Sequence, residues 1–134
     1  MTIGTFSLVA LDCPDAAQLA GFYAAITGWD VVVPTWADAD ADADVAAGRW
    51  LQLRGAGGAT IAFQQIDDYV APTWPGGDRP AQLHLDFDVP DLEVGERAVL
   101  ELGATKAAVQ PDPSAFRVYL DPAGHPFCLI NANG

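Results

Sequence analysis

The sequence predicts an α+β protein made of two tandem βαβββ modules, with a curved, mostly antiparallel sheet and the helices on its convex face. Two observations predict it. Residues 8–26 match residues 84–102 at a constant offset of 76, and three short strand-like stretches follow each matching segment. The segment 71–80, APTWPGGDRP, is dense in proline and glycine and is typical of a linker. We therefore expect one domain over 1–134, with a first module of about 1–70, a linker of about 71–80 and a second module of about 81–134.

Each matching segment opens with strand-like alternation and changes to helical spacing at a Pro-Asp dipeptide. Asp15 and Asp91 stand where a side chain can cap the first helical turn. Gly28 and Gly103 stand where glycine ends a helix in the left-handed conformation. The apolar faces predicted from residues three and four apart are Leu19, Phe22, Tyr23 and Ile26 in the first helix, and Gly95, Ala98, Val99 and Leu102 in the second.

Three further strands are predicted after each helix. In each half the last two are joined by a turn-rich stretch, RGAGGA in the first and DPAGH in the second, which is typical of a hairpin. The six predicted strands are Asp30–Val33, Arg49–Leu53, Thr60–Gln64, Thr105–Val109, Phe116–Leu120 and Pro126–Ile130.

The charge balance excludes two classes of partner. With 6 basic against 18 acidic residues, the net charge is −12. Nucleic acids and anionic membranes would be repelled, whereas cationic or neutral small molecules remain compatible. Part of the charge lies in residues 37–45, ADADADADV, which we expect to form an exposed loop because it repels itself. It lacks the glycine and glutamate of an EF-hand calcium loop.

The expected location is the cytoplasm. No apolar run approaches the roughly 18 residues that span a bilayer, and the N-terminal residues lack the basic region of a signal peptide. Cys13 and Cys128 lie in apolar segments without the spacing of a metal site, which predicts buried, reduced thiols.

Three stretches resemble one family. LDCPDAAQLAGFYAAITGW resembles the first βα unit of the vicinal oxygen chelate superfamily, which includes glyoxalases, bleomycin-resistance proteins and dioxygenases. FRVYLDPAGHPFCLI resembles its closing hairpin, and IDDYVAPTWPGGDRPAQLHLDFDV resembles the middle of a glyoxalase-like subgroup. The resemblance implies a homodimer and a small-molecule pocket formed by the sheet.

In metal-dependent members of this superfamily, each module offers a ligand on its first strand and another on its last. The resemblance places Leu8 and His84 on the first strands, Ala62 or Gln64 on the last strand of the first module, and Cys128 on that of the second. The glutamates Glu93, Glu96 and Glu101 all fall on the second predicted helix. We therefore expect the standard metal set to be absent and no cofactor to be required, with a divalent metal as the alternative.

A non-standard site is predicted on the strand Leu83–Val89. Residues two apart share a face, so His84, Asp86 and Asp88 lie opposite the residues under the helix, and Asp12 matches Asp88 at the repeat offset. These groups either line a polar pocket, hold a cation or stand in solvent without a partner. His84 is the candidate general acid or base.

Aromatic side chains supply the apolar part of the predicted pocket. Trp50 and Trp74 are the candidates for ligand contact, since they flank the linker and the sheet edge, whereas we expect most of the other rings to be core or loop anchors: Trp36, Phe63, Tyr69, Phe116 and Tyr119. His125 is predicted to serve the DPAGH turn. Arg54 and Arg79 could orient an anionic group, although surface positions are expected for both.

Three functions follow as alternatives. The first is a metal-independent protein that binds a small cationic or aromatic molecule, as implied by the bleomycin-resistance branch. The second is a lyase or isomerase of the glyoxalase type with an altered metal site around His84. The third is a non-catalytic structural or regulatory module.

Overall fold

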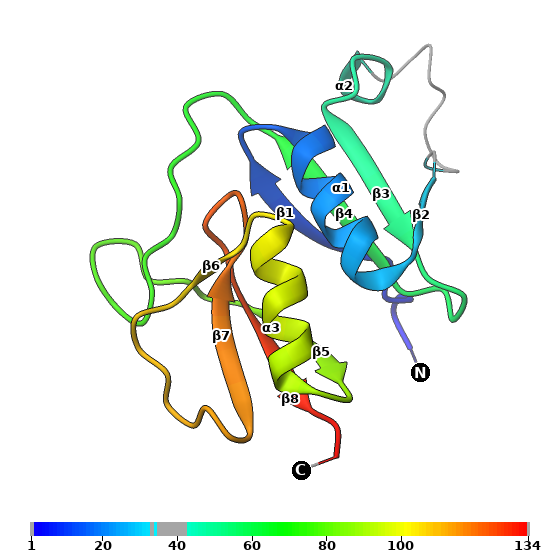
Figure 1. The fold of residues 1–134 in the computed structure, drawn as a ribbon. Coiled ribbons are helices and arrows are strands. Elements are labelled where there is room, and N and C mark those ends of the chain that lie inside the picture. The colour runs from blue at the N-terminus through cyan, green and yellow to red at the C-terminus, as the bar shows by residue number, and fades with distance from the viewer. Residues whose placement is uncertain (1, 33, 35–42, 134) are drawn as a thin grey trace. The chain divides into compact units, whose positions relative to one another are not determined.

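The computed structural model describes residues 2–32, 34 and 43–133. The chain divides into two compact units, Met1–Tyr69 and Val70–Gly134, which we call the first and second modules. Each contains a four-stranded sheet with a long helix against one face (Figure 1). The predicted α+β class with two tandem modules is confirmed.

The first module has its strands in the order β1-β4-β3-β2, with β1 and β4 parallel and the other pairs antiparallel. Its elements are β1 (Val9–Cys13), α1 (Ala16–Thr27), β2 (Asp30–Val32), α2 (Ala43–Ala46), β3 (Trp50–Arg54) and β4 (Thr60–Gln65). Leu19, Phe22 and Tyr23 of α1 are buried, and the Tyr23 ring stacks on Phe63 of β4 at 5.9 Å. Ile26 is half-buried at the end of the same face.

The second module repeats this topology with the strand order β5-β8-β7-β6. Its elements are β5 (Leu85–Val89), α3 (Leu92–Glu101), β6 (Thr105–Lys106), β7 (Phe116–Leu120) and β8 (Pro126–Asn131). Again only the first and last strands, β5 and β8, are parallel neighbours, and the other two pairings are antiparallel. The internal repeat in the sequence is therefore a repeat of topology.

The helix boundaries form as predicted. Asp15 accepts a hydrogen bond from the Gln18 backbone N–H at 3.0 Å, and Asp91 accepts one from Val94 at 3.0 Å. Gly28 ends α1 with a φ of 72°. Each aspartate satisfies a backbone donor that the helix itself leaves without a partner.

Replacing Asp91 with alanine is expected to lower the free energy of unfolding by about 1 kcal/mol, since the Val94 N–H loses its acceptor. The matched control is Asp91→Asn, because asparagine caps about as well as aspartate. Urea denaturation followed by circular dichroism measures both. Equal destabilisation by the two variants would contradict a capping role.

The predicted apolar face of α3 is partly wrong. Leu92 and Val99 are buried, but Ala98 is exposed and Leu102 keeps 41% of its surface exposed. The face turned toward the sheet runs from the buried Leu92 through the partly buried Glu96 to the buried Val99, four and three residues apart. Because a glutamate occupies the middle of this face, the spacing of apolar residues alone predicts the wrong face of α3.

The polar middle of that face forms an ion cluster. The Tyr119 hydroxyl donates a hydrogen bond to Glu96 at 2.9 Å, and the Lys106 ammonium lies 2.8 Å from the same carboxylate. Arg117 lies 3.5 Å from Glu96 and donates to Glu93 at 2.7 Å. The hydrogen bond from Lys106 is the main cause that lowers the pKa of Glu96, whereas burial raises the pKa of Tyr119.

The strand predicted over Thr105–Val109 is shorter than expected, because β6 ends at Lys106. The Gln110 side chain takes the place of further backbone pairing. Its amide donates to the Val118 carbonyl at 2.8 Å and accepts from the Val118 N–H at 2.9 Å. A side chain therefore completes the hydrogen bonding of β7 where a longer strand was expected.

The predicted acidic loop over 37–45 is corrected where it is described. Residues 37–42 and Trp36 lie outside the described residues, and Ala43–Ala46 form the short helix α2 in place of a loop. Asp44 in α2 lies 3.7 Å from Arg49, an ion pair that ties the helix to the start of β3. Among the described helices, none has the length and apolar character needed to cross a membrane.

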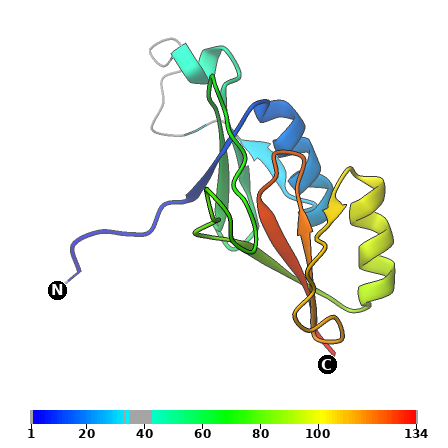
Figure 2. The ribbon, with the colours of Figure 1, turned by 90° about the vertical axis from the view of Figure 1, so that its left-hand side faces the viewer.

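The two faces of the second-module sheet differ in character. On the α3 side, the Phe127 ring stacks on Tyr119 at 5.6 Å and meets Phe87 edge-on at 6.2 Å. Leu129 on the same side lies against Gly95 of α3. Figure 2 shows α3 along one side of β7 and β8. We call the opposite side the open face; residues that alternate with the core residues point there.

Candidate functional site

A cavity of about 340 Å³ lies on the open face of the second module. Its lining comes from β5, β7, β8 and the segments before and between them: Trp74, His84, Asp86, Pro111, Phe116, Val118, Pro126, Cys128 and Ile130. Most of these side chains are apolar, and the polar ones gather in one part of the wall. This combination is typical of a small-molecule pocket.

Strand register builds the cavity floor. Cys128 of β8 pairs with Asp86 of β5 on one side and with Val118 of β7 on the other. Phe116 and Ile130 form the next pair that shares this face. Because side chains alternate across a strand, this same register sends Phe127 and Leu129 into the core under α3. Alternate residues of β8 therefore fill the core on one face of the sheet and line the cavity on the other.

The segment predicted as a linker supplies one wall. Thr73 receives a backbone hydrogen bond from Ala81 at 2.9 Å and donates one to the Arg79 carbonyl at 2.8 Å, which closes residues 73–81 into a loop. The loop places the half-buried Trp74 against the buried cluster of Ala107, Val118 and Cys128. Trp74 is thus a side wall of the cavity and belongs to the second module.

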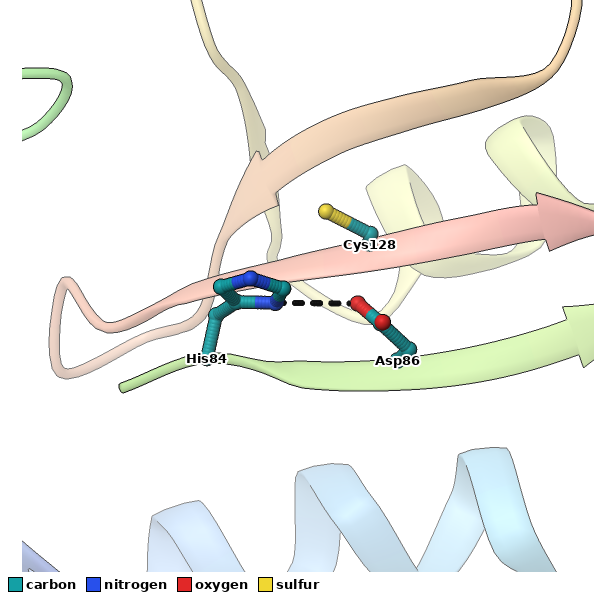
Figure 3. A group of neighbouring side chains, drawn as sticks. All are labelled: His84, Asp86 and Cys128. Atoms are coloured by element: carbon teal, nitrogen blue, oxygen red, sulfur yellow. Dashed lines mark hydrogen bonds and ion pairs between the residues drawn. The ribbon is translucent and has the colours of Figure 1, made fainter. Parts of the chain in front are cut away.

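His84, Asp86 and Cys128 form the polar end of the cavity (Figure 3). The His84 Nδ1 lies 2.9 Å from an Asp86 carboxylate oxygen. These two side chains are about half exposed, at 53% and 51%, whereas Cys128 keeps only 6% of its surface exposed. One nitrogen, one oxygen and one sulfur atom of the three residues lie within 4.8 Å of one another.

Burial raises the pKa of the Cys128 thiol to about 11, and the negative charge of Asp86 adds to the effect. The thiolate is the nucleophile in cysteine chemistry, so Cys128 is a poor nucleophile at neutral pH. The arrangement therefore argues against a catalytic thiolate and in favour of a protonated thiol on the pocket floor.

Alkylation of Cys128 by iodoacetamide is expected to be slower in the folded, chelator-treated protein than in the unfolded chain by on the order of a hundredfold at neutral pH, since fewer thiolates form and access is restricted. Mass spectrometry of the Cys13→Ser variant isolates Cys128. Equal rates in the folded and unfolded chains would show that the thiol is neither buried nor protonated as described.

The structure brings four of the predicted ligand-binding residues together, namely His84, Asp86, Trp74 and Cys128. Asp88 shares their strand face but pairs with Ile130 further along β5 and does not line the cavity.

The other two predicted residues, Trp50 and Gln64, lie in the first module as a cross-strand pair of β3 and β4. The Trp50 indole donates to Gln52 at 2.9 Å. Neither residue lines the second-module cavity.

The remaining predicted positions are largely structural. The His125 backbone N–H donates to the buried Asp121 at 3.0 Å, so His125 belongs to the turn as predicted. Arg54 donates to Thr60 at 3.4 Å on the first-module sheet, and Arg79 is exposed in the 73–81 loop. Phe63 and Tyr119 are core residues, as expected for most of the rings.

Five lining residues were not predicted to meet a ligand: Pro111, Phe116, Val118, Pro126 and Ile130. Four of them are positions of β7 and β8 that alternate with core residues. Applying alternation to these strands, as was done for Leu83–Val89, would have found them. Pro111 carries no such signal, since its place depends on the Gln110 contacts with Val118.

The first module lacks the polar end. The pairs Ala10–Ala62 and Asp86–Cys128 occupy the same place in the two sheets. Ala62 is therefore the counterpart of Cys128, which resolves the choice between Ala62 and Gln64. Leu8, two residues before Ala10, stands where the second module has His84. Among the described residues, the polar trio therefore lies in the second module, and the matching positions of the first module are apolar.

The residues fit poorly the divalent metal that the resemblance implies. Leu8 and Ala62 offer no donor atom, and the remaining two positions hold His84 and the thiol of Cys128. Hard ions such as Mn²⁺ and Mg²⁺ prefer carboxylate, carbonyl and water oxygens. These four side chains therefore offer no oxygen ligand for a hard ion.

Solved structures with the same fold come from several bacteria. A glyoxalase/bleomycin resistance protein/dioxygenase family enzyme from Burkholderia phytofirmans PsJN is 17% identical, with a TM-score of 0.59 over 92% of this chain and 94% of that one. A mutant of the fosfomycin resistance protein FosX from Listeria monocytogenes, complexed with Mn(II) and 1S,2S-dihydroxypropylphosphonic acid, is 17% identical, with a TM-score of 0.64 over 97% and 91%.

A third structure is the antibiotic binding protein TnmS3 from Streptomyces sp. CB03234. It is 19% identical, with a TM-score of 0.55 over 97% of each chain. At these identities the likeness concerns the fold. No curated protein matches the chain in sequence at a significant level. The glyoxalase-like domain family matches residues 8–130, nearly the whole chain. The chain therefore belongs to the glyoxalase-like domain family of the vicinal oxygen chelate superfamily.

Proposed function

We propose that the protein binds a small aromatic molecule that carries a cationic group, in the cavity of the second module. One observation carries the proposal: a cavity of about 340 Å³ has apolar walls and a single polar end. Ligand pockets commonly have volumes of roughly 300–1,000 Å³, so this one suits a compact ligand.

The charge of the polar end favours a cation. Among the described residues that line the cavity there is no lysine or arginine, and Asp86 is the carboxylate. The net charge of −12 raises the local concentration of cations around the whole chain. Because His84 already occupies one side of the Asp86 carboxylate, an ammonium group would bind to the remaining oxygen positions.

The apolar walls favour an aromatic body. Trp74 and Phe116 contribute aromatic rings to the lining, and Val118 and Ile130 contribute aliphatic surface. An aromatic ligand gains both apolar burial and ring–ring contact there, and its cationic group can meet a ring face. The antibiotic binding protein TnmS3 has this fold, which supports the use of the scaffold for binding without specifying a ligand.

The test compares matched fragments of opposite charge. Phenethylamine and 3-phenylpropionate share a phenyl ring and differ in the sign of their charge. Each is titrated into chelator-treated protein while the tryptophan indole N–H resonances are recorded by NMR. We expect phenethylamine to bind with a Kd on the order of millimolar, which a fragment of this size can reach.

The indole signal of Trp74, assigned from its loss in Trp74→Phe, is expected to move, while those of Trp29 and Trp50 stay. Binding of the carboxylate as tightly as the amine would contradict the assigned role of Asp86. Absence of any change at Trp74 with either fragment would remove the support for an aromatic ligand in this cavity.

We also infer that the protein acts in the cytoplasm as a homodimer. Two buried thiols suit a reducing compartment. Exposed apolar side chains at Ile3, Phe6 and Leu83 suit contact with a second copy. Light scattering coupled to size-exclusion chromatography measures the mass, and a monomer at micromolar concentration would contradict the dimer.

A further inference from the structure

We propose that His84, Asp86 and Cys128 together form a binding site for a thiophilic divalent cation, Zn²⁺ above all, contained within the second module. This site differs from the set implied by the resemblance, because all its donors come from one module and it adds Asp86. It goes beyond the proposed function, since it concerns an ion and needs no organic ligand.

The geometry needs only small side-chain movements. The three donor atoms lie within 4.8 Å of one another, and zinc bonds to nitrogen, oxygen and sulfur measure about 2.0–2.3 Å. The His84 Nδ1 and the Asp86 oxygen already lie 2.9 Å apart. A cation between them replaces the proton on His84 Nδ1, which leaves to solvent while Nε2 carries the ring N–H, and it pushes the two atoms apart slightly. Both side chains are half exposed and can rotate toward the sulfur.

The backbone fixes the three positions. Asp86 and Cys128 are register partners of two hydrogen-bonded parallel strands, so their side chains leave the sheet side by side. His84 lies two residues before Asp86 and points to the same side (Figure 3). Asp86 and Cys128 stand on paired strands, which hold donors more precisely than loops do, and His84 directly precedes β5.

The donor chemistry selects the ion. One imidazole, one carboxylate and one thiolate are all accepted by zinc, and cysteine sulfur disfavours Mn²⁺ and Mg²⁺. On binding, the metal–sulfur bond forms as the Cys128 S–H bond breaks, and the proton leaves to solvent. No electron is transferred.

Three protein ligands leave a fourth position of a tetrahedral ion empty of protein. Because all three donors line the cavity, that position faces the space bounded by Trp74 and Phe116. A bound ion would therefore present a coordination position to whatever small molecule enters. It would also neutralise the charge that attracts an organic cation, so zinc and phenethylamine would compete.

The first module supplies an internal comparison. Its counterparts of His84, Asp86 and Cys128 are Leu8, Ala10 and Ala62. The same scaffold position thus holds three donors in one module and three apolar side chains in the other. The scaffold does not require polar residues there, which favours a specific use of the trio.

The test uses Co²⁺, which replaces zinc and reports sulfur ligation through a thiolate-to-cobalt charge-transfer absorption in the near ultraviolet. Chelator-treated, reduced protein is titrated with Co²⁺ alone. We expect one Co²⁺ per chain and a charge-transfer band that Zn²⁺ abolishes at stoichiometric amounts. Mn²⁺ and Mg²⁺ are expected to leave the band unchanged when present at about a hundredfold excess.

Single substitutions test which side chains bind Co²⁺ and give rise to the charge-transfer band. Cys128→Ala is expected to lose the band, while the matched control Cys13→Ala keeps it. His84→Ala and Asp86→Asn are expected to weaken Co²⁺ binding at least tenfold, while Asp88→Asn, on the same strand face, leaves it unchanged. Circular dichroism confirms that each variant is folded.

A band that persists in folded Cys128→Ala, stoichiometric binding without a band, or no binding to the parent protein would each overturn the inference. The fragment titration under chelator contains no metal, and the cobalt titration contains no organic ligand. Failure of the metal site therefore leaves the proposed function testable, and the reverse also holds.

Discussion

Replacing Trp74 with alanine is expected to weaken phenethylamine binding about tenfold, which corresponds to about 1.4 kcal/mol. Trp74 forms an apolar wall of the cavity beside Cys128 and Val118. Its removal takes away ring–ring and cation–π contact, each of the order of 1 kcal/mol. The Trp74 indole signal is absent from this variant, so the Kd is measured by NMR titration from the backbone amide resonances of Val118 and Cys128 in the cavity.

The matched control is Trp50→Ala. Trp50 is also half-buried and lies at the start of β3, but it donates its indole N–H to Gln52 in the first module. We expect the Kd for phenethylamine to stay within about twofold of the parent value, because Trp50 is not a wall of the cavity. Equal weakening by both substitutions would mean that Trp74 is not the specific contact.

Replacing Glu96 with alanine is expected to lower the free energy of unfolding by about 2–3 kcal/mol. The substitution removes the acceptor of the buried Tyr119 hydroxyl and the partner of Lys106, and it removes one of the two carboxylates beside Arg117. Glu101→Ala, an exposed glutamate on the same helix, is the control and should cost less than about 0.5 kcal/mol. Denaturant unfolding measures both.

The pH dependence of stability has a definite sign. The pKa of Glu96 is lowered in the folded protein, chiefly by the hydrogen bond from Lys106. Its contribution is therefore present above the unfolded value of about 4.3 and is lost as pH falls through the folded pKa. The variant Glu96→Gln should show an acid limb with a smaller slope, by up to about one proton. An unchanged slope would contradict the shift.

The sequence predicts the fold well because its signals are local. The Pro-Asp caps and the positions of Phe116–Leu120 follow from turn chemistry and alternation, and all are found. The predicted end of the strand at Val109 is wrong, because β6 ends at Lys106 and the Gln110 side chain pairs with Val118 of the neighbouring strand β7 instead. The predicted face of α3 is partly wrong because Glu96 is turned toward the sheet, where its partners on β6 and β7 partly bury it.

The candidate site also has a part that the sequence predicts and a part that depends on the tertiary structure. Alternation along one strand placed His84 and Asp86 on one face, and the family resemblance singled out Cys128. Their closeness depends on the pairing of β5 with β8, which joins residues about forty positions apart. Trp74 reaches the cavity through a closed loop. Trp50 and Trp74 look equally suitable in the sequence, and only the tertiary structure separates their roles.

The most direct measurement is a crystal structure of the chelator-treated protein with phenethylamine. Binding in the second-module cavity predicts the ammonium nitrogen within hydrogen-bonding distance of the Asp86 carboxylate and the phenyl ring against Trp74 and Phe116. Density for the ligand on the first-module sheet beside Trp50 and Gln64, with the cavity at Asp86 containing only solvent, would contradict the account.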